Sequence, residues 1–200
     1  MLKQKSIIMS IAVLAMSFMV GCTQSDGNST SQESDFKADQ EVIVINGHTL
    51  PPKPDPKVNN ATLLGIDSNN NGVRDDVERK IYFQYKRPIE QAFMMQDAKI
   101  YPQTLEDPVA AAVSKKLEKE HWNVESCDGY LILQGIKIKN SVNFMENAYF
   151  NTKERMRAYI EFNEASSGGV YHIPLPRDAD KENCDFNITE MLEMEKSKLL

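Results

Sequence analysis

The sequence predicts a mainly α fold, a small helical domain that opens with a short β-hairpin and a loop–helix segment. Apolar side chains recur at helical spacing from Asp76 onward. The dipeptide Asn46-Gly47, the preferred two-residue hairpin turn, lies in a run of β-branched residues. With 200 residues, 41% of them hydrophobic and 26% charged, the chain is long enough for one globular domain.

The net charge limits the classes of partner. The chain has 23 Lys and Arg against 29 Asp and Glu, a net charge of −6. Proteins that bind nucleic acid usually present a basic surface to the phosphate backbone. We therefore expect no nucleic-acid partner.

The N-terminus has the pattern of an export signal. Lys3 and Lys5 precede the mostly apolar run Ile7–Val20, which is shorter than the about 20 apolar residues that span a bilayer. The run ends in Met19-Val20-Gly21-Cys22. This ending resembles the lipobox of bacterial lipoproteins, in which a small residue precedes an obligatory cysteine.

The lipobox resemblance implies that residues 1–21 are a signal peptide and that Cys22 becomes the lipidated first residue, with palmitate among its acyl chains. Several acyl chains suffice for stable anchoring in a membrane. Because Thr23 rather than Asp follows the cysteine, the resemblance implies the outer membrane, on its periplasmic face or at the cell surface. The alternative is an ordinary secretory signal followed by a chance cysteine.

Two segments separate the signal from the helical domain. Residues 22–40 are mostly Ser, Gln, Asp, Asn and Gly, which cannot bury enough apolar area to fold, so we expect a flexible tether. Residues 41–58 combine the hairpin with prolines at 51, 52, 54 and 56. These prolines exclude a helix across that stretch and predict an extended strap.

The helical domain is assigned to residues 59–200. A first helix is expected from Asp76 and a second after Pro88, which breaks or restarts the chain. The aromatic side chains at helical spacing, Tyr82, Phe83, Tyr85 and Phe93, are expected in the core, with a ligand groove as the alternative. The apolar positions are Val77, Ile81, Tyr82, Tyr85, Ile89, Phe93, Met94 and Ile100.

Further helices follow. Asp107-Pro108 is typical of an N-cap followed by proline at the first helical position. One apolar stripe is expected from Val109 to Leu117 and a longer one from Val142 to Ile160, with Glu154, Arg155 and Arg157 on a solvated face. Residues 131–138 fit a helix or a strand, and the tail from residue 189 fits a short helix.

The segment Asp67–Glu78, DSNNNGVRDDVE, has the spacing of a twelve-residue calcium loop. Calcium prefers six to eight oxygen ligands, which a chain supplies compactly by alternating ligand and non-ligand residues around a tight turn. Gly72 stands where the backbone turns sharply. The expected ligands are Asp67, Asn69, Asn71, Val73 through its carbonyl, Asp75 and Glu78.

This loop resembles those of EF-hand proteins, dockerins and thrombospondin type 3 repeats. Arg74 stands at position 8, where paired EF-hands have an aliphatic residue, and at most one helical turn fits between Pro56 and Asp67. We therefore expect a structural Ca²⁺ site with an exit helix only, and an affinity of roughly 10⁻⁴–10⁻³ M. The alternative is an Asn-rich turn that caps a helix without an ion.

Two cysteines remain if Cys22 is lipidated. Cys127 and Cys184 form an even pair, which in an oxidising compartment suggests one disulfide. The alternative is free thiols, including a dyad of Cys127 with His121 or His172.

The sequence lacks the familiar catalytic motifs, so no catalytic residue is assigned. We expect a lipid-anchored envelope protein that binds or scaffolds another envelope protein. The segment from Pro51 to Tyr82 also resembles uncharacterised gammaproteobacterial lipoproteins, a resemblance that implies no activity. An envelope hydrolase and a calcium-dependent adhesin module are the alternatives. A cavity in which His, Asp and Tyr converge with shifted pKa values would favour the enzyme.

Overall fold

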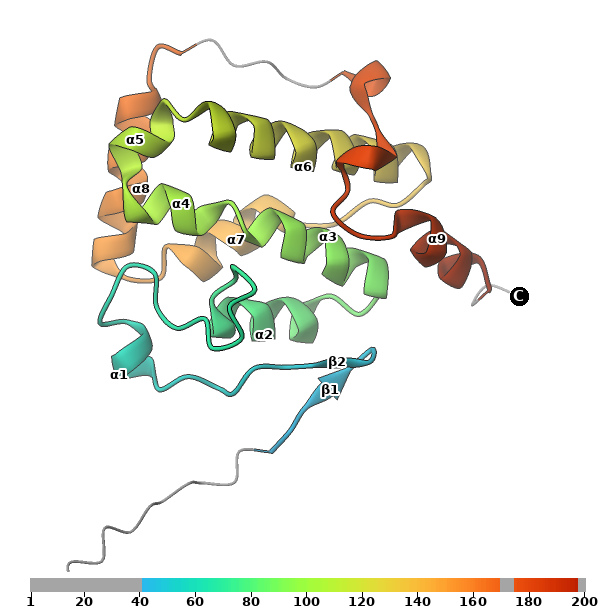
Figure 1. The fold of residues 1–200 in the computed structure, drawn as a ribbon, viewed down its shortest axis with the longest axis horizontal. Coiled ribbons are helices and arrows are strands. Elements are labelled where there is room, and N and C mark those ends of the chain that lie inside the picture. Colours follow the sequence, from blue (N-terminus) through green and yellow to red (C-terminus); the bar gives the residue numbers. More distant parts are fainter. Residues whose placement is uncertain (1–40, 170–174, 198–200) are drawn as a thin grey trace, which may run out of the picture. The chain divides into compact units, whose positions relative to one another are not determined.

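A computed structural model describes residues 41–169 and 175–197 as a mainly helical domain preceded by a two-stranded antiparallel hairpin (Figure 1). This confirms the predicted fold class. The predicted signal peptide, the tether, Cys22 and His172 lie outside the described residues. The elements are β1 Val44–Ile45, β2 His48–Thr49, α1 Pro56–Asn59, α2 Asp75–Gln84, α3 Pro88–Ala98, α4 Tyr101–Glu106, α5 Pro108–Ala112, α6 Lys115–Leu133, α7 Ser141–Tyr149, α8 Lys153–Ser166, the 3₁₀ turns η1 Pro176–Asp178 and η2 Lys181–Asn183, and α9 Ile188–Ser197.

The hairpin turns where the sequence predicts. Asn46 and Gly47 have φ angles of 51° and 80°, the left-handed pair that a tight turn between twisted strands requires. After the proline strap, the Asp55 side chain caps α1 by accepting hydrogen bonds from the backbone N–H groups of Lys57 and Val58. Helix α1 is a single turn, as the limited room before Asp67 requires.

Helices α2 and α3 also follow the prediction, except that Phe83, expected in the core, is exposed on α2. Val77 and Ile81 of α2 and Phe93 and Met94 of α3 are buried in one core. Pro88 is the first residue of α3. At this position a backbone N–H has no acceptor within the helix, so proline, which lacks the N–H, loses no helical hydrogen bond. The two helices pack against each other.

The predicted stripe from Val109 to Leu117 is not one helix. Asp107 caps α5 as expected, accepting a hydrogen bond from Ala110 N. Helix α5 then ends, and the Ser114 side chain caps α6 by accepting from Leu117 N. Because the helical register restarts there, Val109 and Val113 are exposed rather than buried.

The predicted stripe from Val142 to Ile160 is likewise two helices. Thr152 caps α8 by accepting a hydrogen bond from Arg155 N, which separates α8 from α7. Met145 of α7 is buried, but Val142 and Ile160 are exposed. The apolar spacing does not continue from α7 into α8, so a single helical stripe does not describe which residues face the core.

The ambiguous segment 131–138 contains the end of α6 and a loop. Helix α6 ends at Leu133, and Gly135, with φ of 78°, reverses the chain. Ile136 and Ile138 of the loop are buried in the core.

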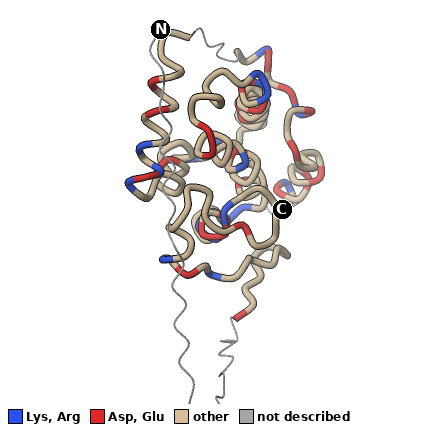
Figure 2. The backbone as a smooth tube through the Cα atoms, turned by 60° about the vertical axis from the view of Figure 1, so that its left-hand side comes forward, with Lys and Arg blue, Asp and Glu red and all other residues tan. Residues whose placement is uncertain are grey.

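Helix α3 packs against α2, α6 and α9, while α4 and α5 pack on α8 (Figure 1). Lys or Arg and Asp or Glu residues are interspersed along the helices (Figure 2). Cys127 of α6 and Cys184, which follows η2, form the expected disulfide, with an S–S distance of 2.01 Å. In the part of the chain that the structure describes, no helix is long and apolar enough to cross a bilayer.

Candidate functional site: the loop 67–78 and its arginine support

The loop 67–78 follows α1 and includes the first turn of α2, and a backbone hydrogen bond closes its first part. Asp75 N donates to Ile66 O over 2.7 Å, which joins the residue before the loop to the start of α2. Asn70 and Gly72 have positive φ angles of 54° and 85°, so the chain turns sharply where the sequence places its glycine.

Side-chain oxygens in the first half of the loop hold this turn. The two carboxylate oxygens of Asp67 accept hydrogen bonds from Asn71 N at 3.2 Å and Gly72 N at 2.9 Å. Asn69 Oδ1 accepts from Asn71 N, and Asn71 Oδ1 accepts from Val73 N. Each of these oxygens has a second lone pair that could bind a cation. Val73, whose carbonyl is a predicted ligand, has its side chain in the core.

The acidic residues of the second half face the same loop. Glu78 is fully buried, and its Oε2 accepts hydrogen bonds from Asn69 Nδ2 at 3.2 Å and Asn71 Nδ2 at 2.6 Å. Asp75 is buried as well, and its Oδ1 accepts from Ser68 N. The structure thus brings the side chains of Asn69, Asn71 and Glu78 into direct contact.

The carboxylates of Asp67 and Glu78 are close enough to Asp75 to affect its pKa. The pKa of Asp75 is raised, chiefly because burial disfavours the charged form, and further by the negative charges of Asp67 and Glu78. A cation among these three groups would relieve both effects.

A metal in this loop would need amide and carbonyl ligands. Among the described residues, no group of three or more His, Cys, Asp or Glu is arranged to hold a metal ion. Calcium loops do not require such a group, because amide and backbone oxygens complete their coordination. The oxygen-only donor set present here fits calcium better than zinc or another metal that prefers nitrogen or sulfur.

His48 joins the hairpin to the loop. Its Nε2 lies 2.6 Å from Glu78 Oε1, and its ring stacks on Tyr82 with 4.4 Å between centroids. The local sequence around His48 does not indicate this contact, because thirty positions separate it from Glu78.

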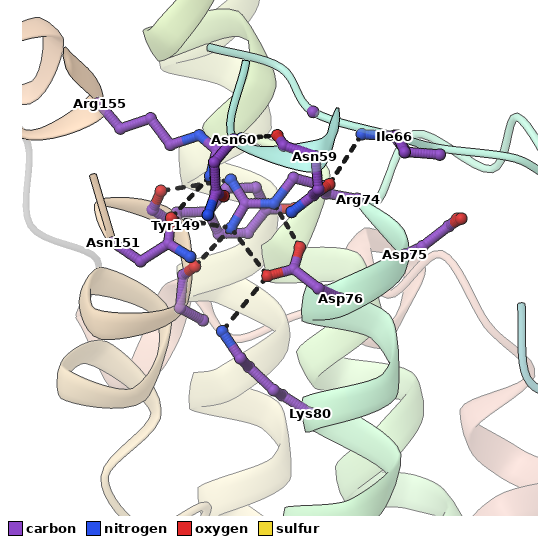
Figure 3. A network of polar contacts seen from close by, with 12 residues as sticks. Asn59, Asn60, Ile66, Arg74, Asp75, Asp76, Lys80, Tyr149, Asn151 and Arg155 are labelled. Atoms are coloured by element: carbon purple, nitrogen blue, oxygen red, sulfur yellow. Dashed lines mark hydrogen bonds and ion pairs between the residues drawn. The ribbon is translucent and has the colours of Figure 1, made fainter. Parts of the chain in front are cut away.

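Arg74, the residue at position 8, anchors the loop to α7. It is almost fully buried and donates through Nη2 to Ala148 O at 2.6 Å. Its guanidinium pairs with Asp76 and lies 5.3 Å from the centroid of the Tyr149 ring (Figure 3). Helix α7 therefore supports the loop at the position where paired EF-hands contact a sister loop.

The expectation that Arg155 lies on a solvated face is wrong. Arg155 is fully buried on α8, and its guanidinium donates to backbone carbonyls of α1 and the turn that follows it (Figure 3). A fixed fork of five N–H donors suits such a set of acceptors. The acceptors are Asn59 O, Thr62 O, Leu63 O and the side-chain oxygens of Asn60 and Asn151. Most of them are more than ninety positions away, beyond the range of a periodicity analysis.

Gly65 allows the two arginines to approach the chain. Its φ is +72°, and a Cβ added there would lie 2.3 Å from Arg74 Cδ, 2.7 Å from Asn59 Oδ1 and 2.9 Å from Arg155 Nη2. Burial and the charge of Arg74 lower the pKa of Arg155 to about 10, so the Arg155 guanidinium is charged at neutral pH.

Cys127 is bonded to Cys184, so the free-thiol and dyad alternatives are contradicted. Cys22, the predicted lipidation site, lies outside the described residues. Comparison of the chain with protein-family models, curated protein sequences and solved structures finds no match.

Proposed function

We propose that this protein is a lipid-anchored cell-envelope protein with a structural calcium site in the loop 67–78, and that its helical domain binds or scaffolds another envelope component. The observation that carries the calcium site is the contact of Glu78, a buried carboxylate, with Asn69 and Asn71, two other expected ligands. In the calcium-bound loop the ion would take the place of the amide donors around Glu78.

The position of the loop supports a structural role for the ion. Glu78 is the third residue after Asp75 in α2 and contacts His48 of the hairpin. Calcium would therefore hold the hairpin, the loop and the start of α2 together. Arg74 joins the loop to α7, and Arg155 joins α8 to the turn that precedes the loop. We therefore expect calcium to stabilise a loop that is already folded.

Calorimetric titration with CaCl₂ tests the calcium site. The sample is the mature protein without residues 1–21 and with Cys22→Ser, which lacks both the expected signal peptide and the expected anchor. Asp67→Ala and Glu78→Gln should abolish the heat of binding, whereas Glu161→Gln, which removes one exposed charge on α8, should retain it. Absence of binding heat in the parent protein, together with a melting temperature that chelation leaves unchanged, would contradict the proposal.

The anchor has its own test. Labelling with radioactive palmitate should mark the wild-type protein and leave Cys22→Ser unlabelled. Equal labelling of both would show that Cys22 is not the lipidated residue.

One observation favours an enzyme as a second candidate. Asp97, Tyr101 and His121 line one cavity, and burial together with the charge of Asp128 raises the pKa of Asp97 to about 7. A carboxyl group with such a pKa is suited to general acid–base chemistry near neutrality. Turnover of a chromogenic ester, phosphate or glycoside that Asp97→Asn abolishes would support this candidate.

A further inference from the structure

A second candidate site lies away from the calcium loop, in the cavity that Asp97 lines. The cavity has a volume of about 490 Å³ and lies between α3, α6, the start of α7 and η1. This volume falls in the range of small-molecule sites. None of the expected calcium ligands lines it.

Three carboxylates face this cavity, those of Asp97, Glu125 and Asp128. Burial, and after it the charge of Asp128, raises the pKa of both Asp97 and Glu125, so Asp128 is close enough to repel each of the other two carboxylates. No lysine or arginine is among the described residues that line the cavity. Partial desolvation lowers the pKa of His121, which favours its neutral form.

Asp97 is the most strongly desolvated of these acids, and desolvation is the main cause of its raised pKa. Its side chain is half-buried and lines the cavity. Within the described part of the chain, no hydrogen bond or ion pair reaches its carboxylate, so the charge faces the cavity without a protein partner. A cation bound in the cavity would provide the missing partner.

The rest of the lining is apolar. Phe93 and Tyr101 bring aromatic rings to the cavity, and rings of this kind attract cations. Four exposed apolar side chains also line it, which gives the acidic site a hydrophobic margin. They are Ile132, Leu133, Val142 and Leu175.

We propose that this cavity binds a small organic ammonium ion with an apolar body. The ammonium group would lie against Asp97 and Asp128, and the apolar body against the hydrophobic margin. A bare metal ion fits less well, because the described Asp, Glu and His side chains include no group arranged to hold one, and because a metal would leave the apolar lining uncovered.

One hydroxyl group of the lining, that of Ser126, is not available for covalent chemistry. Ser126 is the hydroxyl group closest in sequence to the acids, and it is fully buried. It donates to Asp178 O and accepts from Asp180 N and Asn183 Nδ2. These three bonds leave it unavailable as a nucleophile.

Calorimetry at pH 8 with three probes tests the proposal on the mature protein without residues 1–21 and with Cys22→Ser. Hexylammonium has both the positive charge and a long alkyl chain. 1-Hexanol has the same alkyl chain without the charge, and ethylammonium has the charge with a short alkyl chain. We expect hexylammonium to bind at least about tenfold more tightly than either of the others. Asp97→Asn and Asp128→Asn should each weaken its binding about tenfold, and Glu161→Gln should leave it unchanged.

Two results would overturn the proposal. Equal affinity for hexylammonium and hexanol would show that the carboxylates do not contribute. Unchanged hexylammonium binding in both Asp97→Asn and Asp128→Asn, with circular dichroism showing both variants folded, would place the ligand elsewhere. Loss of calcium binding in Asp67→Ala leaves this test unaffected, because the two sites share no residue.

Discussion

Arg155 determines how α8 contacts the beginning of the domain. Its guanidinium satisfies carbonyl groups that would otherwise be buried without donors. We expect Arg155→Met to reduce the free energy of unfolding by about 3–5 kcal/mol, the typical result of removing one member of a buried polar network. Urea denaturation measures this change. Arg157→Met, an exposed change on the same helix, should alter stability by less than about 0.5 kcal/mol, and similar losses in both variants would contradict the assigned role.

Gly65 is required for two reasons, its left-handed backbone and the lack of space for a side chain. Gly135 has a similar φ of +78°, but nothing lies within 4 Å of a Cβ added there. Gly135→Ala should therefore cost only the backbone strain, about 1 kcal/mol, and Gly65→Ala distinctly more, because Arg74 and Asn59 must move. Thermal unfolding of the two variants isolates the steric effect, and equal melting temperatures would refute it.

Asp97 should make the stability of the protein depend on pH. Its pKa is about 7 when folded, against 3.8 as the ordinary value. Between these values the folded state binds more protons than the unfolded state, so the contribution of Asp97 to stability falls as pH rises, by at most about 1.4 kcal/mol per pH unit. The raised pKa of Asp128 acts in the same direction.

Asp97→Asn removes this titrating group. The variant should be more stable than the wild type at pH 8, with a difference that narrows toward pH 5. Urea unfolding across this range gives the comparison. A wild type that gains stability over Asp97→Asn as pH rises would show that the carboxylate has a cationic partner in the free protein.

At the scale of elements, the disulfide joins two segments that are far apart in the chain. Cys127 and Cys184 are separated by 57 positions, and a crosslink of that length is worth about 4 kcal/mol through the entropy of the unfolded chain. The double variant Cys127→Ala with Cys184→Ala should lose stability by about this amount. Guanidinium unfolding measures the loss, and dithiothreitol should destabilise the wild type but not the double variant.

Capping residues define the helices more strongly than hydrophobic periodicity does. Asp107, Ser114 and Thr152 each accept a hydrogen bond from a backbone N–H at the start of a helix. Asp107 can be predicted as a cap because proline follows it, whereas the apolar spacing continues through Ser114 and Thr152 and conceals their caps. Val113 and Ile160, assigned to apolar stripes, are therefore exposed.

For the whole molecule, calcium should stabilise folding by mass action. With a dissociation constant of roughly 10⁻⁴–10⁻³ M, 10 mM calcium adds about 1.4–2.7 kcal/mol to the free energy of unfolding. Differential scanning calorimetry should show a corresponding rise in melting temperature that Glu78→Gln abolishes. An identical rise with 10 mM magnesium would argue against a calcium loop, since magnesium prefers a tighter octahedral shell.

The sequence alone determined the features that depend on neighbouring residues. Asn46-Gly47 specified the hairpin, Pro88 the start of α3 and Asp107 the cap of α5, because turns and caps are formed by contacts within a few positions. The same holds for the glycine turn of the loop 67–78, whose hydrogen bonds lie within the loop.

Only the tertiary structure decided the features that depend on distant residues. The burial of Arg74 and Arg155, the contact of His48 with Glu78 and the acidic cavity at Asp97 all join segments that are far apart in the chain. A charged residue on a helix has the same local pattern whether water or buried carbonyl groups surround it. Packing determines which of these environments it has, and packing depends on the whole chain.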